Sequence, residues 1–293
     1  MVEADRASWR SEALGPPRTL ELSQGRLRVH VTGEGPPIVF VHGLLVNANL
    51  WRKVVPRLDG YTRMTLDLPL GSHLEAMPDA DLTAPGLADL IADVIDALDL
   101  TEVTVVGNDT GGGLTQIAAV RRPERIGRLV LTSCDAFENF PPPFFRVVLA
   151  PARIPGAIPV AFGGLRLRPL RRLPIAYGWL SNEPIDSDAE DSYVLPVLTR
   201  RAIRRDLRRV LGGLDKEHTL DAAEKLQRFD KPALVAWSSN DRFFPPEHGE
   251  RLAELIPRGR LQWIEAARTF SPEDRPERLA ELIDSFIGGP APA

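Results

Sequence analysis

The sequence predicts an α/β fold in which a mostly parallel, doubly wound sheet carries an inserted helical cap. Two features support this prediction. Short β-branched runs alternate with helical patterns in both halves of the chain, and a long segment rich in proline and aromatic residues interrupts the alternation. With 293 residues, of which 43% are hydrophobic, the chain can bury one large core or a core with an inserted subdomain.

The predicted elements follow the order that a doubly wound sheet requires. Short apolar runs that end in turn residues are typical of buried parallel strands, and they occur at 37–41, 62–66, 102–107, 129–131, 232–237 and 261–264. Helical patterns occur at 49–58, 83–98, 247–256 and 276–287. The last of these begins with Pro276, at a first-turn position that tolerates the missing N–H.

The most informative motif is the turn that follows the strand at 102–107. Gly107 and Gly111 lie two residues before and two residues after Asp109. This is the spacing of a nucleophile elbow, Gly-x-Ser-x-Gly, in which small residues let strand and helix approach closely. Gly, Asn and Asp clusters also mark ordinary turns. The upstream strand and its His42-Gly43 loop favour the elbow, with a carboxylate as the nucleophile.

In these two motifs and in the order of its elements, the chain resembles the α/β-hydrolase family from about Arg18 to Ile287. The Asp in the nucleophile position resembles the branch that contains haloalkane dehalogenases and epoxide hydrolases. The resemblance implies three parts: a flexible N-terminal tail at 1–17, a core domain at 18–136 and 215–289, and a helical cap at 137–214 that shapes the pocket.

A carboxylate at the elbow can displace halide or open an epoxide, and the product is an alkyl ester on the enzyme. In related folds the oxyanion hole uses the backbone N–H that follows the nucleophile, here Thr110, and one from the loop after the first parallel strand, here Leu44. The N-terminus of the following helix favours the ionised form of Asp109.

The resemblance also implies an acid that orients a histidine. Asp241, on the loop after the strand at 232–237, occupies the usual position of this acid. Asp135 is the competing candidate because some dehalogenase-like members place their acid after the preceding strand. The sequence leaves this choice open.

The histidine itself departs from the family pattern. The flanking residues align so that Thr269 falls in the position of the catalytic histidine. A hydroxyl cannot act as a general base near neutral pH, and such a base contributes a factor of about 10²–10⁴ to hydrolysis. Either another group replaces the histidine, or the reaction is not ordinary hydrolysis.

Six further side chains are candidates for the pocket. His42 is expected to orient the loop, and His73 is the best candidate among the histidines to replace the missing base. The others are two possible side-chain N–H donors and two cap tyrosines that could protonate an epoxide oxygen: Asn47, Trp51, Tyr177 and Tyr193. No cofactor and no metal are expected, since no pair of histidines has metal-ligand spacing.

Composition limits the expected partners. The formal net charge of −4 gives no basic excess for nucleic acid, and no segment is apolar enough to span a bilayer, so neither nucleic acid nor membrane is expected. The arginines at 200–209 have helical spacing and are interpreted as a solvated or salt-bridged helix face. The single cysteine, Cys134, excludes an intrachain disulfide, and the first residues lack the apolar core of a secretory signal. These features favour a cytoplasmic protein.

We therefore expect a hydrolase that uses Asp109 on a small or medium apolar substrate of the haloalkane or epoxide type. Two alternatives stay open. One is a cofactor-independent lyase, isomerase or cyclase in which Asp109 shuttles protons. The other is a ligand-binding member of the family that has lost turnover.

Overall fold

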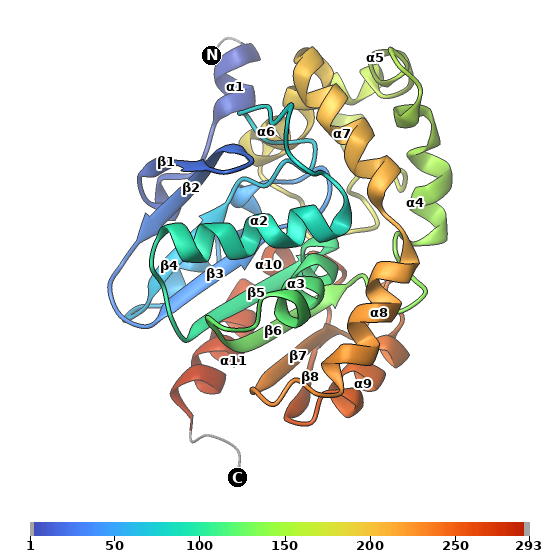
Figure 1. Cartoon of the computed structure of the whole chain (residues 1–293). Coiled ribbons are helices and arrows are strands. Elements are labelled where there is room, and N and C mark those ends of the chain that lie inside the picture. Colours follow the sequence, from blue (N-terminus) through green and yellow to red (C-terminus); the bar gives the residue numbers. More distant parts are fainter. Residues whose placement is uncertain (1–2, 290–293) are drawn as a thin grey trace.

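A computed structural model describes residues 3–289 and shows an eight-stranded sheet between helices (Figure 1). The strand order is β1-β2-β4-β3-β5-β6-β7-β8; β1 and β2 pair antiparallel, as do β2 and β4, and the other neighbours are parallel. The predicted fold class is confirmed. The strands are β1 (Pro17–Leu22), β2 (Gly25–Thr32), β3 (Pro37–Val41), β4 (Thr62–Leu66), β5 (Val103–Asp109), β6 (Ile126–Cys134), β7 (Ala233–Ser238) and β8 (Gly259–Ile264).

The central strands are buried on both faces because helices cover the sheet on each side. All seven residues of β5 and all six of β7 are buried. The sheet-flanking helices are α2 (Ala84–Ala97), α3 (Thr110–Arg121), α8 (Lys216–Leu226), α9 (Pro246–Leu255) and α11 (Pro276–Gly288), with the short α10 (Ser271–Asp274) before the last. Figure 1 shows α2, α3 and α8 across one face of the sheet and α11 behind it.

Between β6 and α8 the chain forms a series of short helices that we call the inserted helical segment, residues 143–213. These helices gather at one end of the molecule (Figure 1) and fall within 137–214, where the cap is predicted. They are α4 (Pro143–Val148), η4 (Ala150–Arg153), α5 (Ile158–Ala161), η5 (Gly163–Arg166), η6 (Arg168–Arg172), α6 (Ser187–Thr199) and α7 (Arg201–Gly213), where η denotes a 3-10 helix.

The region predicted as a helix at 49–58 differs from the expectation. It forms two 3-10 turns, η2 (Ala48–Trp51) and η3 (Val55–Arg57). Pro56 supplies no backbone N–H, and an α-helix cannot run through it without losing a hydrogen bond and meeting a steric clash. The apolar side chains of this region are buried nonetheless, so the hydrophobic pattern reports burial here rather than an α-helix.

The first residues also differ from the flexible tail that the sequence suggested. They form α1 (Glu3–Ser8) and η1 (Glu12–Leu14), and Leu14 is fully buried. Arg10 makes an ion pair with Asp67, 2.8 Å between Nη2 and Oδ2, and both side chains are almost completely buried. A buried carboxylate needs such a partner, and Arg10 keeps the pKa of Asp67 low although burial alone would raise it. This pairing fixes the N-terminal segment on the core.

Among residues 3–289, no helix combines the length and apolarity needed to cross a bilayer.

Candidate active site

Asp109 is the last residue of β5 and precedes the first turn of α3. Its backbone has φ 53° and ψ −133°, a conformation that costs a non-glycine residue about 1–3 kcal/mol. The turn is tight, because a Cβ on Gly111 would lie 2.4 Å from the carbonyl oxygen of His42. A strained aspartate, followed two residues later by a glycine that has no room for a side chain, is typical of a nucleophile elbow.

Two backbone N–H groups hold the Asp109 carboxylate. The N–H of Leu44 donates to Oδ2 at 3.1 Å, and the N–H of Thr110 also hydrogen-bonds the side chain. Burial nevertheless raises the pKa of Asp109 to about 7, and the charge of Asp241 adds to this shift. The two N–H groups predicted as an oxyanion hole therefore already bind an anionic oxygen, that of Asp109 itself.

Asp109 opens into a small apolar cavity of about 80 Å³. A second cavity of about 40 Å³ adjoins it and is also apolar; the two share Leu45, Leu149, Phe162, Leu165 and Tyr177. Most of the lining comes from the inserted helical segment. Phe145 lies on α4 and Leu165 on η5, while Leu149 and Phe162 lie between short helices, and the sequence patterns did not single these residues out. The available signal was an aromatic-rich segment without acidic residues after β6.

Thr269, which the sequence comparison by motif predicts in the histidine position, contacts the predicted acid. Its hydroxyl donates to Oδ1 of Asp241 at 3.0 Å, and its side chain is fully buried. The same oxygen of Asp241 accepts from the N–H groups of Phe243, at 2.8 Å, and Phe244, at 3.0 Å. Burial raises the pKa of Asp241, and these hydrogen bonds oppose the shift. Oδ2 of Asp241 is buried and has no hydrogen-bond partner of normal geometry in the described part of the chain, although the side chain of Ser133 lies near enough to oppose the pKa shift in part.

Asp135, the competing acid, lies just after β6 and is fully buried. Neither of its carboxylate oxygens has a hydrogen-bond partner of normal geometry among residues 3–289, although the side chain of Thr110 lies near enough to oppose its pKa shift in part. Burial and the charge of Asp109 raise its pKa well above the usual range. Of the two acids, Asp241 is the one that contacts Thr269.

Asn108 is a residue of this site that the sequence interpretation missed. Its amide donates to the carbonyl oxygen of Thr269 at 2.7 Å and to the hydroxyl of Thr132 at 2.8 Å. It therefore ties the elbow to the loop that carries Thr269. Its position next to Asp109 was the only signal in the sequence.

His42 orients the loop between β3 and η2 and does not act as a base. It is fully buried, its Nδ1 lies 2.8 Å from the carbonyl oxygen of Gly43, and its Nε2 accepts from the N–H of Leu68 at 3.0 Å. Burial lowers the pKa of His42 to about 4, so the ring is neutral at pH 7. The ring thereby holds the loop that presents the N–H of Leu44.

Three candidates lie outside the cavity, which corrects the expectation for each. Trp51 is fully buried in the core and packs on Phe40, with ring centroids 5.0 Å apart. The amide of Asn47 donates to the carbonyl oxygen of Ser192 on α6 at 3.0 Å.

His73 is the third of these. Its Nε2 lies 3.4 Å from Oδ2 of Asp206 on α7, so it joins the inserted helical segment to the core and does not replace the missing base. For Asn47 and His73, a partner distant in sequence holds the side chain away from Asp109.

The two tyrosines of the inserted segment lie together, with ring centroids 5.9 Å apart. Tyr177 lines the cavity of Asp109, and its hydroxyl donates to the carbonyl oxygen of Leu45 at 2.8 Å. Tyr193 lines the adjoining cavity and is fully buried. Burial raises the pKa of both hydroxyls, so both are protonated at neutral pH.

Within residues 3–289, no group of three or more His, Cys, Asp or Glu side chains is placed to hold a metal ion.

Comparison with known proteins gives a consistent result. Residues 36–276 match a family model described as alpha/beta hydrolase fold. The chain is 29% identical over 268 residues to the uncharacterized hydrolase YugF of Bacillus subtilis, covering 85% of this chain and 89% of that protein. It is 28% identical over 288 residues to a haloalkane dehalogenase of Agrobacterium fabrum, covering 89% and 88%. The solved structure of an alpha/beta hydrolase fold protein from Burkholderia ambifaria matches with a TM-score of 0.78 at 25% identity, covering 91% of this chain and 96% of that one.

Proposed function

Because the chain belongs to the α/β hydrolase fold family, we propose that it is a hydrolase whose nucleophile is the carboxylate of Asp109. The observation that supports this most is the environment of that carboxylate. One oxygen is bound by the N–H of Leu44, and the side chain faces an apolar cavity. An anion in such surroundings is poorly solvated and therefore reactive toward carbon.

The substrate class follows from the cavity. Its lining is almost entirely aliphatic and aromatic, and it offers no cation for a charged group. We propose a small or medium apolar alkyl halide or epoxide, in keeping with the haloalkane dehalogenase of Agrobacterium fabrum among the relatives. Attack by the free oxygen of Asp109 forms a C–O bond, while the bond to halide or epoxide oxygen breaks and its electron pair leaves with that atom.

The product of this step is an ester whose carbonyl oxygen is Oδ2, which the N–H of Leu44 already binds. The oxyanion that forms when water attacks this ester is therefore stabilised by donors in place. Water still needs a base, and Thr269 cannot supply one. We propose that the ester forms faster than it is hydrolysed.

A second function has an observation in its favour. Asp109, Asp135 and Asp241 are all buried, and all three have raised pKa values. A carboxyl group such as Asp109, whose pKa is raised to about 7, can give and take a proton in a water-poor cavity, as a cofactor-independent lyase, isomerase or cyclase requires. A ligand-binding member without turnover is the third possibility.

The experiment that separates these functions follows product release and intact protein mass together. Purified protein is incubated with a panel of alkyl halides and epoxides. The proposal expects an adduct of one alkyl group per chain, with one equivalent of halide released quickly and further release slowly. Absence of both adduct and halide release across the panel would reject the nucleophile and favour the proton-transfer or binding function.

The rate of adduct formation is expected to depend on pH. Only ionised Asp109 can attack, and its pKa is raised to about 7, so the rate should rise with pH and reach half its maximum near pH 7. Stopped-time mass spectrometry at a series of pH values measures this. Asp241→Asn removes a charge that raises this pKa, so it should move the midpoint to lower pH. A rate that is constant from about pH 5 upward would contradict the buried, protonatable nucleophile.

A further inference from the structure

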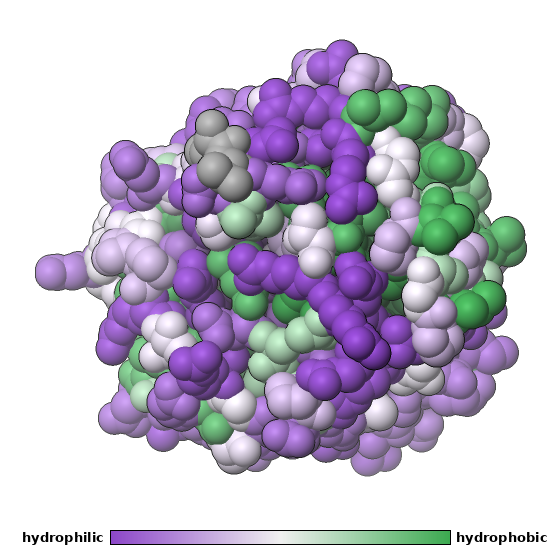
Figure 2. Space-filling model, turned by 90° about the horizontal axis from the view of Figure 1, so that it is seen from above, coloured by the Kyte–Doolittle hydropathy of each residue, from purple (hydrophilic) through white to green (hydrophobic). Residues whose placement is uncertain are grey.

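The surface of the inserted helical segment is unusually apolar. In the described part of the chain, the large apolar side chains that are exposed all lie between residues 147 and 175. Val160 on α5 is 87% exposed and Val147 on α4 is 76% exposed. Figure 2 shows hydrophobic side chains gathering along the right side of the face seen from above. The full set is Val147, Ile154, Val160, Leu167, Leu173 and Ile175. Exposed apolar residues grouped in this way mark an interaction site.

The same segment is basic, although the chain as a whole is acidic. Residues 139–182 contain six arginines and neither aspartate, glutamate nor lysine. Some of these arginines pair with carboxylates elsewhere, as Arg166 does with Glu3 and Arg171 with Asp191. On α7, Arg205 pairs with Asp206, whereas Arg201, Arg204 and Arg208 make no ion pair with the described residues.

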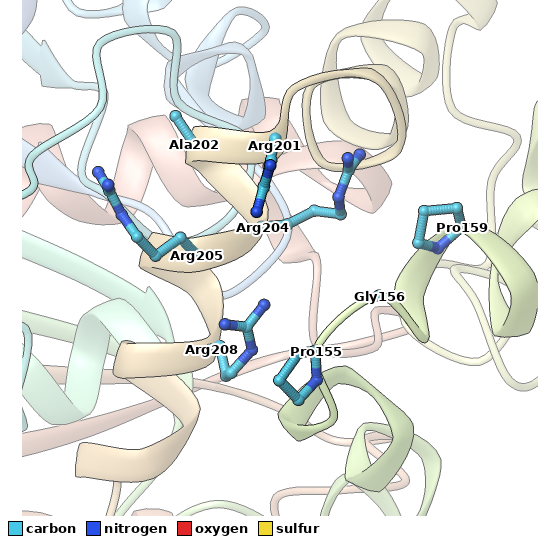
Figure 3. A pocket seen from close by; sticks show the side chains of 8 residues that line it. All are labelled: Pro155, Gly156, Pro159, Arg201, Ala202, Arg204, Arg205 and Arg208. Carbon is cyan, nitrogen blue, oxygen red and sulfur yellow. The ribbon is translucent and has the colours of Figure 1, made fainter.

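Four arginines of α7 line a groove of about 790 Å³ opposite Pro155, Gly156 and Pro159 (Figure 3). Arg201, Arg204, Arg205 and Arg208 follow helical spacing and therefore share one face of the helix. No acidic residue lines the groove. In the described structure, Nε of Arg208 is buried without a hydrogen-bond partner. A guanidinium group with an unused donor is suited to phosphate oxygens, which it can bind through two parallel hydrogen bonds.

The arginines and the apolar side chains lie next to each other. Pro155, Gly156 and Pro159 form the wall of the groove opposite α7. The exposed Ile154 comes just before these residues in the sequence, and the exposed Val160 comes just after them. Ile175 is 55% exposed and also lines the cavity of Asp109. Cationic groups and exposed apolar side chains therefore adjoin at this groove, and the exposed Ile175 also lines the cavity of Asp109.

We propose that this surface docks on a lipid bilayer that has anionic headgroups. The surface is formed by α4, α5, the residues that follow α5 as far as Ile175, and the arginine face of α7. The arginines of α7 contact headgroup phosphates, and the exposed apolar side chains enter the boundary between headgroups and acyl chains. A nucleic acid would satisfy the arginines but would leave Val147 and Val160 in water.

Docking of this kind needs no bilayer-spanning segment. The sequence-based expectation of no membrane partner rested on the absence of such a segment and on the interpretation of the arginines as a solvated face. Docking is also independent of the chemistry at Asp109, so it can be tested whatever the reaction is.

The test is sedimentation of the full chain with lipid vesicles. We expect the protein to bind vesicles of equal parts phosphatidylglycerol and phosphatidylcholine at low ionic strength, to bind phosphatidylcholine vesicles weakly, and to be released by high salt. Each arginine at such a surface contributes roughly fivefold to the binding constant. The double variant Arg201→Glu/Arg208→Glu should therefore bind at least about tenfold more weakly.

The matched control is Arg18→Glu/Arg260→Glu. It changes the net charge by the same amount, and it alters two exposed arginines on β1 and β8, the two edge strands of the sheet. It should bind as the natural chain does. Val147→Ser/Val160→Ser should weaken binding with the arginines intact, and thermal unfolding confirms that each variant is folded.

Three results would overturn the proposal. The first is no binding to phosphatidylglycerol vesicles, and the second is equal loss in the control pair. The third is loss in the arginine pair with none in the valine pair, which would indicate an anion site that does not enter the bilayer.

Discussion

Asp109→Asn is expected to abolish the alkyl adduct and to lower the single-turnover rate of halide release by at least about 10⁴-fold. The substitution keeps the shape of the side chain, and the amide oxygen can still accept from the N–H of Leu44. A neutral amide is too weak a nucleophile to displace halide, so only the chemistry is removed. Rapid-quench halide release and intact mass, measured on the same samples, test this.

Asp135→Asn is the matched control for that variant. Asp135 is as deeply buried as Asp109 and lies close enough for the two charges to influence each other. Burial raises its pKa and so favours the neutral carboxyl, which an amide resembles, and the substitution should change the adduct rate little. An adduct that persists in Asp109→Asn and disappears in Asp135→Asn would move the nucleophile to Asp135.

The sequence predicted the strand, turn and helix around Asp109 because the constraints on this turn are local. Gly107 and Gly111 stand at a fixed spacing around Asp109, and strand and helix patterns on either side specify where the turn must be. The strained backbone of Asp109 and the close approach of Gly111 to the loop after β3 are consequences of that short segment. The order of strands and helices was predictable for the same reason, since each pattern covers a few consecutive residues.

The surroundings of the site were harder to predict because their partners are distant in sequence. Asn47 and His73 each follow a strand that ends near the site, which made them candidates. Ser192 and Asp206, more than 130 residues further along the chain, bind these two side chains instead. No pattern around residue 47 or 73 carries this information.

The arginines at 200–209 are a similar case. Helical spacing alone is equally consistent with a solvated helix face and with a binding groove. The groove depends on a second wall, and that wall is supplied by Pro155, Gly156 and Pro159 from a different part of the inserted segment. The arginines of α7 and the exposed apolar side chains of the inserted segment come together only when the chain is folded.

The departure at Thr269 is the strongest constraint on the reaction, and it can be reversed. Thr269→His is expected to raise the multiple-turnover rate by about 10²–10⁴-fold while the rate of adduct formation changes little. Oδ1 of Asp241 already lies 3.0 Å from the hydroxyl of Thr269, and its Oδ2 has no hydrogen-bond partner of normal geometry among residues 3–289. An imidazole in this position can donate one N–H to Asp241 and take a proton from the attacking water through its other nitrogen.

Thr269→Asn is the matched control, since it places a polar planar group in the same position without a base, and its turnover should stay at the level of the natural chain. Thr269 is fully buried, so thermal unfolding is measured for both variants.

If histidine is too large for the fold, Thr269→Ala with imidazole added to the solution supplies the base in another way, and turnover should rise with imidazole concentration. Adduct that forms normally and is hydrolysed no faster with either base would show that water activation does not limit this enzyme.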